Sequence, residues 1–264
     1  MPTLRIATWN LERPKKNGNV KNQSRLEMLR EIDADLWVLT ETHSAITLDG
    51  YHCLATPAQP GYHAEGESFA AIWSRWPIRR SIPTFDPHFA ACAEINSPLG
   101  PLLVFGTIIT YANDRGINGK SRRWEEHRKS IAAHAADWLR LRAEFPDHLI
   151  CVAGDFNQSR DGSGWYEDAQ SVANLSLALD QASLCCVTEL DMRAHGLSRA
   201  TIDHICLSHP LATAVQAVGA WEGKTKDGER MSDHNGIFVE IGTQSESQLT
   251  NPPVKLAGVL RSSR

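Results

Sequence analysis

The sequence lacks any apolar run long enough to cross a membrane, and its start does not have the pattern of a signal peptide. Arg5 interrupts the apolar start, and Asn10 and Glu12 follow it closely. We therefore expect a cytoplasmic protein. A hydrophobic content of 42% and a charged content of 22% are typical of a globular chain, and 264 residues can form one domain.

Several familiar catalytic and metal-binding motifs are also missing. The chain has no Gly-x-Ser-x-Gly nucleophile elbow, and none of its 11 histidines belongs to a His-Glu-x-x-His pair. These absences argue against a serine hydrolase and against a zinc site of the peptidase type. The 6 cysteines have no Cys-x-x-Cys spacing, and most lie in apolar strand-like runs. We expect buried free thiols rather than disulfides or zinc ligands.

The chain has no overall excess of basic residues. Its formal net charge is −4, which argues against broad electrostatic capture of nucleic acid. Two segments, residues 13–25 and 115–123, are nevertheless basic and contain no acid. Each is typical of a solvated loop, but each directly follows a segment with candidate site residues. The candidate substrate contacts in these loops are Lys15, Lys16, Arg122 and Arg123.

Strand-like and helical segments alternate along the chain. Apolar side chains at helical spacing predict helices over residues 25–32 and 121–141, and the tryptophans of the second helix are expected to lie in the core. Short apolar runs, divided by prolines in the first half, predict strands. The predicted strands are residues 4–8, 36–39, 69–73, 90–95, 102–109, 149–153, 202–207, 214–220 and 236–241.

Polar side chains follow the end of one of these strands. Residues 152–157 read Val-Ala-Gly-Asp-Phe-Asn, so that an apolar run breaks at a glycine and then presents a carboxylate and a carboxamide. Side chains two apart on a strand share a face, so Asp155 with Asn157, and likewise Asn10 with Glu12, are each expected to point at one pocket. Alone, this pattern is also typical of a turn.

Four more segments place similar groups at the ends of strands, in the order Asn-x-Glu, Thr-Glu, Ile-Asp-His and Ser-Asp-His-Asn. With Gly-Asp-Phe-Asn among them, residues 3–241 resemble the endonuclease/exonuclease/phosphatase superfamily. This superfamily includes pancreatic-type deoxyribonucleases, abasic-site endonucleases, inositol-polyphosphate 5-phosphatases and neutral sphingomyelinases. The resemblance implies an α/β four-layer sandwich, with two mixed β-sheets packed face to face and helices outside. Residues 1–242 would be the catalytic domain, and the polar residues 243–264 a disordered tail.

Hard oxygen ligands suited to Mg²⁺, with Mn²⁺ as a substitute, are available at the ends of two strands. Glu12 and Glu41 are the candidates, because Mg²⁺ keeps several waters and uses only one or two carboxylates. Glu41 alone would also fit an ordinary acid on a solvated loop. By resemblance, Asp233 lies near the metal or its waters, and Asn10 contacts the substrate.

The resemblance also assigns the catalytic groups. Asp155 would orient or deprotonate the attacking water, and Asn157 would donate to a phosphoryl oxygen. Asp203 would hold His234 by a hydrogen bond, which fixes the tautomer of the imidazole and raises its pKa. His204 follows Asp203 directly, so alternation should turn it away from the site, and we expect it to be structural.

One position departs from the superfamily. Many members carry a histidine or tyrosine, directed at phosphate, in the strand that corresponds to residues 103–108. Here the aligned residue is Ile108. Tyr111 and Asn113 lie just beyond it, and Tyr111 is the candidate substitute.

These observations predict a divalent-metal-dependent phosphoester hydrolase, foremost a phosphodiesterase or nuclease. The alternative is a phosphomonoesterase acting on a small phosphorylated metabolite or a lipid headgroup. A catalytically silent binding module should have lost at least one key residue, whereas all of them are present: Glu41, Asp155, Asn157, Asp203 and His234. We expect a monomer whose partner is a phosphoester, with nucleic acid as one candidate, and no protein partner.

Overall fold

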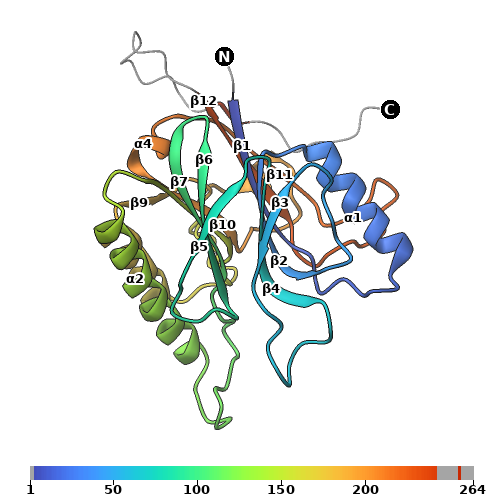
Figure 1. The fold of residues 1–264 in the computed structure, drawn as a ribbon. Coiled ribbons are helices and arrows are strands. Elements are labelled where there is room, and N and C mark those ends of the chain that lie inside the picture. The colour runs from blue at the N-terminus through green and yellow to red at the C-terminus, as the bar shows by residue number, and fades with distance from the viewer. Residues whose placement is uncertain (1–2, 243–254, 257–264) are drawn as a thin grey trace.

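Two β-sheets pack face to face, and the long helices cover their outer sides (Figure 1). The computed structural model describes residues 3–242 and 255–256. Within these residues the first sheet has 7 strands and the second has 6, and both contain parallel and antiparallel pairs. The predicted four-layer α/β sandwich of two mixed sheets is confirmed.

The first sheet combines strands from both ends of the chain. Its order is β13-β11-β12-β1-β2-β4-β3, in which β1 pairs with β2 in parallel and with β12 in antiparallel fashion. The strands are β1 (Thr3–Asn10), β2 (Leu36–His43), β3 (His52–Ala55), β4 (Glu67–Ser74), β11 (Val215–Trp221), β12 (Gly236–Gly242) and β13 (Lys255–Leu256).

The second sheet is formed by the middle of the chain, in the order β5-β6-β7-β8-β10-β9. Its central strands β7 and β8 are parallel, and β10 is antiparallel to β8. The strands are β5 (Ile78–Ile82), β6 (Ala90–Ser97), β7 (Gly100–Ile108), β8 (Leu149–Asp155), β9 (Leu184–Cys186) and β10 (Asp203–Ser208).

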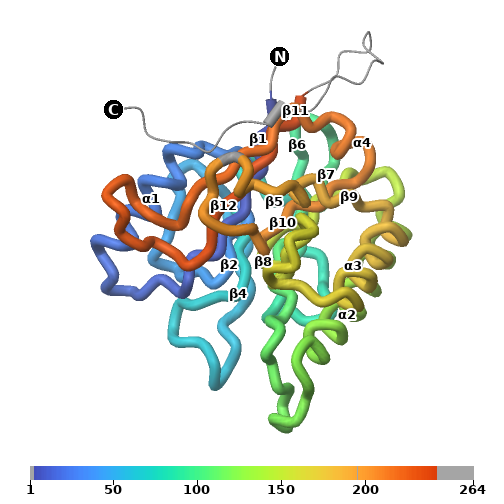
Figure 2. Tube along the Cα trace, turned by 180° about the vertical axis from the view of Figure 1, so that it is seen from behind, coloured from blue at the N-terminus to red at the C-terminus, as the bar shows by residue number. Residues whose placement is uncertain are grey.

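Helices lie on opposite sides of the sandwich. Helix α1 (Asn19–Ile32) covers the first sheet, whereas α2 (Glu125–Glu144) and α3 (Ala169–Gln181) cover the second (Figures 1 and 2). A short 3-10 helix, η1 (Met192–His195), and a one-turn helix, α4 (His209–Ala212), lie in the connections around β10. No described helix is long and apolar enough to span a membrane.

Strand alternation divides the buried side chains among three apolar layers. In β8, Cys151 and Ala153 face the first sheet, whereas Ile150 and Val152 face the helices α2 and α3. Because successive side chains point to opposite faces, a strand buried on both sides reads as a continuous apolar run. This explains why the central strands were recognisable as runs without an alternating pattern.

All of the predicted strands are present, with ends shifted by one to a few residues. The predicted core role of the tryptophans in α2 is also confirmed, since Trp138 is 1% exposed. Helix α3 and strands β3, β5 and β9 were not predicted. The signal for α3 was in the sequence, because Leu175, Ala178 and Leu179 recur at helical spacing and are buried. The Asp168 carboxylate caps this helix by accepting a hydrogen bond from the Ser171 amide at 3.1 Å.

The cysteines are all free, as predicted. The expectation that they are buried holds for Cys92, Cys151 and Cys206 and is wrong for Cys53 and Cys185, which are exposed. Both exposed residues lie on the outermost strands β3 and β9, where one flank of the strand has no neighbour.

The polar segment over residues 243–264 lies outside the described residues, except for Lys255–Leu256. These two residues form β13 and pair in parallel with β11. For the rest of residues 243–264 the expected disordered tail stays a prediction. The outer side of β11 offers unpaired backbone groups, and these are the groups that an added strand satisfies.

Gly154 allows β8 to lie close to β7 directly before Asp155. Its φ is +138°, and an added Cβ atom would lie 1.9 Å from the carbonyl oxygen of Thr107 on β7. The glycine is therefore required by backbone packing as well as by its dihedral angle. The Gly in Gly-Asp-Phe-Asn fixes the position of the strand end that carries Asp155.

We expect Gly154→Ala to lower the free energy of unfolding by at least about 3 kcal/mol, because the methyl group has a rigid backbone atom in its way. Gly162→Ala is the matched control. Gly162 also has a positive φ, of +70°, but no atom lies within 4 Å of the added Cβ, so only the backbone penalty of about 1–2 kcal/mol applies. Urea unfolding of both variants measures the difference. Equal losses would show that packing against Thr107 is unimportant.

Candidate functional site

Polar side chains from both sheets meet at one end of the sandwich. Asn10 ends β1 and Glu41 lies near the end of β2, whereas Asp155 ends β8 and Asp203 begins β10. His234 lies two residues before β12. Since β12 is antiparallel to β1 and β10 is antiparallel to β8, the starts of these strands lie beside the ends of their partners. The face-to-face packing of the sheets then brings the two groups together.

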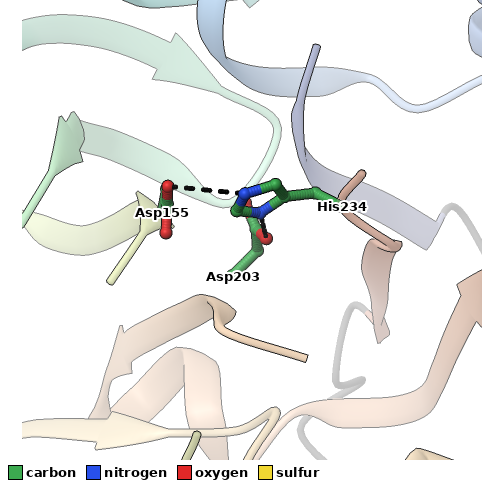
Figure 3. Close-up of side chains that lie close together, drawn as sticks. All are labelled: Asp155, Asp203 and His234. Atoms are coloured by element: carbon green, nitrogen blue, oxygen red, sulfur yellow. Dashed lines mark hydrogen bonds and ion pairs between the residues drawn. The ribbon is translucent and has the colours of Figure 1, made fainter. Parts of the chain in front are cut away.

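Asp203 and His234 form a hydrogen-bonded pair between the sheets (Figure 3). His234 Nδ1 donates to Asp203 Oδ2 at 2.6 Å, and His234 Nε2 lies 3.9 Å from Asp155 Oδ2. Burial alone would lower the pKa of His234, but the charges of Asp203 and Asp155 outweigh it and raise the pKa to about 10. The imidazole is therefore protonated at neutral pH, with its Nε2–H directed away from Asp203.

The segment that carries His234 is anchored to β1. Ser232 Oγ donates to the carbonyl oxygen of Asn10 at 2.6 Å and accepts from the His234 amide at 3.0 Å. Trp9 Nε1 donates to the His234 carbonyl oxygen at 3.0 Å. These bonds fix the backbone on both sides of the histidine, so that its ring position depends on the first sheet.

Asp155 lies in a network of amide donors. Asn10 Nδ2 donates to Asp155 Oδ2 at 3.0 Å, and the Asn157 backbone amide donates to Asp155 Oδ1 at 2.8 Å. Asn157 Nδ2 donates to Asp155 Oδ2 at 3.1 Å and to the Ile109 carbonyl oxygen at 3.0 Å. Burial raises the pKa of Asp155 to about 7, a value suited to exchanging a proton with water near neutral pH. Both amide hydrogens of Asn157 are used in this network, so Asn157 supports Asp155 in this arrangement.

Glu41 is a partly buried carboxylate without a cation partner among the described residues. Its Oε1 accepts a hydrogen bond from Asn10 at 3.2 Å, and burial raises its pKa. Asp233, which also raises the pKa of Glu41, is half exposed. His234 is the cation that Asp155, Asp203 and Asp233 share, while Arg230 also pairs with Asp233 at 3.9 Å and the charge of Arg13 acts on Glu41.

This excess of negative charge fits a divalent cation. Uncompensated carboxylates are costly to bury, and hard oxygen donors are the ligands of Mg²⁺ and similar ions. One oxygen each of Asp155 and Asp203 and one nitrogen of His234 lie within 4.8 Å of one another, which is compact enough to share an ion. A protonated imidazole does not coordinate a metal, so the carboxylates are the groups of this cluster that could hold an ion, and the roles of Glu41 and Asp233 as its ligands stay predictions.

Glu12 does not join this cluster. Its carboxylate forms ion pairs with Arg230 and, at 3.3 Å, with Lys21. The expectation that Asn10 and Glu12 share a face is wrong, because β1 ends at Asn10 and Glu12 has a left-handed backbone with a φ of +53°. Alternation applies only while the chain stays extended. Two cations already neutralise Glu12, and its role as a metal ligand stays a prediction.

The remaining predicted residues lie around the site on the surface. Tyr111 is 52% exposed in the turn after β7. Ile108 is buried, as its apolar side chain requires, and pairs with Asp155 in the parallel register of β7 and β8. The four cations of the basic loops are exposed and form no ion pair with any described residue: Lys15, Lys16, Arg122 and Arg123.

His204 faces away from the site, as alternation predicted. It is buried, its Nε2 bonds to the Gln158 carbonyl oxygen at 2.9 Å, and its Nδ1 lies 3.2 Å from Thr188 Oγ1. It is therefore a satisfied histidine of the core.

Sequence reasoning missed three residues beside the histidine pair. Trp165, Tyr166 and Arg199 line a pocket of about 190 Å³ together with Asp203 and His234. A Trp-Tyr pair inside the polar, glycine-containing loop after β8 was the available signal, because aromatic residues in such loops are often functional. Arg199 gave no signal in the sequence.

Solved structures with similar folds are nucleases and phosphatases. A 3′ phosphatase from Neisseria, bound to a product DNA hairpin, is 18% identical, with a TM-score of 0.66, and the match covers 91% of this chain and 100% of that one. An AP endonuclease from Archaeoglobus fulgidus is 15% identical, with a TM-score of 0.67 and coverage of 91% and 100%. An AP endonuclease from Leishmania major is 13% identical, with a TM-score of 0.68 and coverage of 92% and 88%.

At these identities the structural likeness establishes the fold. No curated protein matches the sequence. The model of the Endonuclease/Exonuclease/phosphatase family matches residues 7–234, a span that contains the strand ends and the histidine pair described above. The chain therefore belongs to this family and is a phosphoesterase.

Proposed function

We propose that the protein is a divalent-metal-dependent phosphodiesterase that acts on nucleic acid. The observation that carries the proposal is the opposition of Asp155, whose pKa is raised to about 7, and the imidazolium of His234 at 3.9 Å. A near-neutral carboxylate and a fixed cation that lie side by side can both reach one phosphate group, the first through a water and the second through a phosphoryl oxygen. Glu41 and the half-exposed Asp233 lie next to them.

Each residue has a distinct part in the proposed reaction. Asp155 orients the attacking water and accepts its proton, while Asn10 and Asn157 hold the carboxylate in place. His234 donates a hydrogen bond from Nε2 to the phosphoryl oxygens, on which negative charge develops. Asp203 keeps the imidazole charged and oriented. Glu41 and Asp233 would hold a divalent ion, which would supply a Lewis acid for the non-bridging oxygens.

Nucleic acid is the substrate class that the surroundings favour. Exposed cations that form no ion pair with any described residue lie on the two basic loops, and such residues contact phosphates along a strand. The similar structures include AP endonucleases and a phosphatase bound to DNA. A phosphomonoesterase is the second candidate, because one of these neighbours is a 3′ phosphatase. The cytoplasmic location and the monomeric state stay predictions.

A panel of substrates tests the proposal. We expect hydrolysis of plasmid DNA or an abasic duplex in the presence of Mg²⁺ or Mn²⁺, loss of activity in EDTA, and recovery when the metal is added back. RNA, an aryl phosphodiester and inositol phosphates complete the panel. Full activity after exhaustive chelation would contradict metal dependence, and exclusive cleavage of monoesters would favour the second candidate.

Metal binding has a readout that does not require turnover. A ligand present at about 100 times its Kd stabilises the folded state by about 2.7 kcal/mol, which corresponds to roughly 5–10 °C in Tm for a domain of this size. We expect Mg²⁺ to raise the Tm of the wild type in this range and to have little effect on Glu41→Gln. Glu27→Gln, which removes an exposed acid of α1, is the control. An equal rise in Glu41→Gln would remove Glu41 from the ligands.

The histidine pair predicts non-additive effects on turnover. His234→Ala should lower kcat by about 10²–10⁴-fold, the range for a positioned acid–base group. Asp203→Asn should lose a large part of the same factor, and the double variant should be little worse than His234→Ala, because residues that act as a unit are not additive. Thermal melts identify losses that come from unfolding. Independent, multiplicative losses in kcat would show that the two residues do not act together.

A further inference from the structure

The pocket beside the histidine pair extends past the catalytic residues. Its volume is about 190 Å³, and its far side is formed by Trp165 and Tyr166 from the loop after β8 and by Arg199 from the segment before β10. Pockets that enclose a whole drug-sized ligand measure about 300–1,000 Å³. This pocket is therefore suited to one chemical group of a larger substrate, next to the group that reacts.

Arg199 is held in the wall of this pocket. Its carbonyl oxygen accepts a hydrogen bond at 3.4 Å from Asn235 Nδ2, and Asn235 directly follows His234. The guanidinium carbon lies 5.6 Å from the centroid of the Trp165 ring. Stacking on an aromatic face restricts the side chain without using its N–H donors.

The guanidinium has no other partner. Within residues 3–242 and 255–256, no carboxylate forms an ion pair with Arg199 and no acceptor takes a hydrogen bond from it. Most other arginines near the site are paired, for example Arg13 with Glu67 and Arg230 with Glu12. Five oriented donors therefore remain available at the pocket, in the planar arrangement that matches a phosphate group.

Tyr166 contributes a second donor to the lining of the pocket. Its Oη accepts a hydrogen bond from the Ala112 amide at 3.2 Å, which leaves the hydroxyl hydrogen free to donate. Burial raises the pKa of Tyr166, so the hydroxyl stays protonated. A half-buried hydroxyl held by the Ala112 amide and a guanidinium that lines the same pocket are a suitable pair of donors for an anion.

We propose that Arg199 and Tyr166, with Trp165 behind the guanidinium, bind a second phosphate of the substrate, adjacent along the strand to the phosphate that is cleaved. The inference rests on the proposed function and narrows it. The preferred substrate carries a neighbouring phosphate, as every internal position of a nucleic acid strand does, and simple diesters lack the group that this pocket binds.

The first experiment measures binding without turnover. In EDTA, deoxythymidine 3′,5′-bisphosphate and the two deoxythymidine monophosphates are titrated calorimetrically into the full-length protein. We expect the wild type to prefer the bisphosphate by roughly tenfold to a hundredfold, since a hydrogen bond between charged groups contributes about 1.5–3 kcal/mol. Arg199→Gln should abolish this preference, Tyr166→Phe should reduce it, and Arg199→Lys should restore part of it. Arg30→Gln, an exposed arginine of α1, is the control and should keep it.

The second experiment measures selectivity in turnover. The kcat/KM of Arg199→Gln should fall at least tenfold more on a 5′-phosphorylated thymidine dinucleotide than on an aryl phosphodiester without a second phosphate. Equal losses on both substrates would overturn the inference, and so would a wild type that binds the bisphosphate no tighter than the monophosphates. Arg199-dependent binding in a protein that cleaves no phosphoester would support the pocket and reject the proposed function. The two experiments therefore distinguish a wrong inference about the pocket from a wrong proposal about the enzymatic activity.

Discussion

The hydrogen bond between His234 Nδ1 and Asp203 joins the two sheets at the site, and the other features of the site depend on it. Asp203 belongs to the second sheet, whereas the segment of His234 is anchored to the first through Ser232 and Trp9. The bond therefore forms only when the sheets pack in their final register. Its charge then raises the pKa of the imidazole and places a cation opposite Asp155.

The electrostatics of the site follow from an imbalance between acids and cations. Around His234 the acids outnumber the cations, and Glu41 and Asp155 respond with raised pKa values. Outside this cluster several cations lack an ion pair, because Arg199 and the loop residues Lys15, Lys16, Arg122 and Arg123 form none with any described residue. A metal ion and an anionic substrate together would compensate both regions.

The sequence predicted the sheets and most of the cluster, because both depend on local patterns. Apolar runs marked the strands, and the motifs at the strand ends marked Glu41, Asp155, Asp203 and His234. Glu12 lies outside the cluster, in ion pairs with Arg230 and Lys21 that no local pattern of the sequence indicates, and its role as a metal ligand stays a prediction. Arg199 was missed because its position depends on a hydrogen bond from Asn235, a contact that only the folded chain provides.

The pairing of Asp155 with Asp203 in neighbouring strands limits which parts of the site can change during evolution. The backbones that carry the two carboxylates are separated by one interstrand step, about 4.7–4.9 Å in any sheet. Insertions or deletions in the loops cannot change that separation, whereas Trp165, Tyr166 and Arg199 lie on loops that can vary freely. The reaction geometry is thus fixed by the backbone ladder, and the choice of substrate is left to segments outside it.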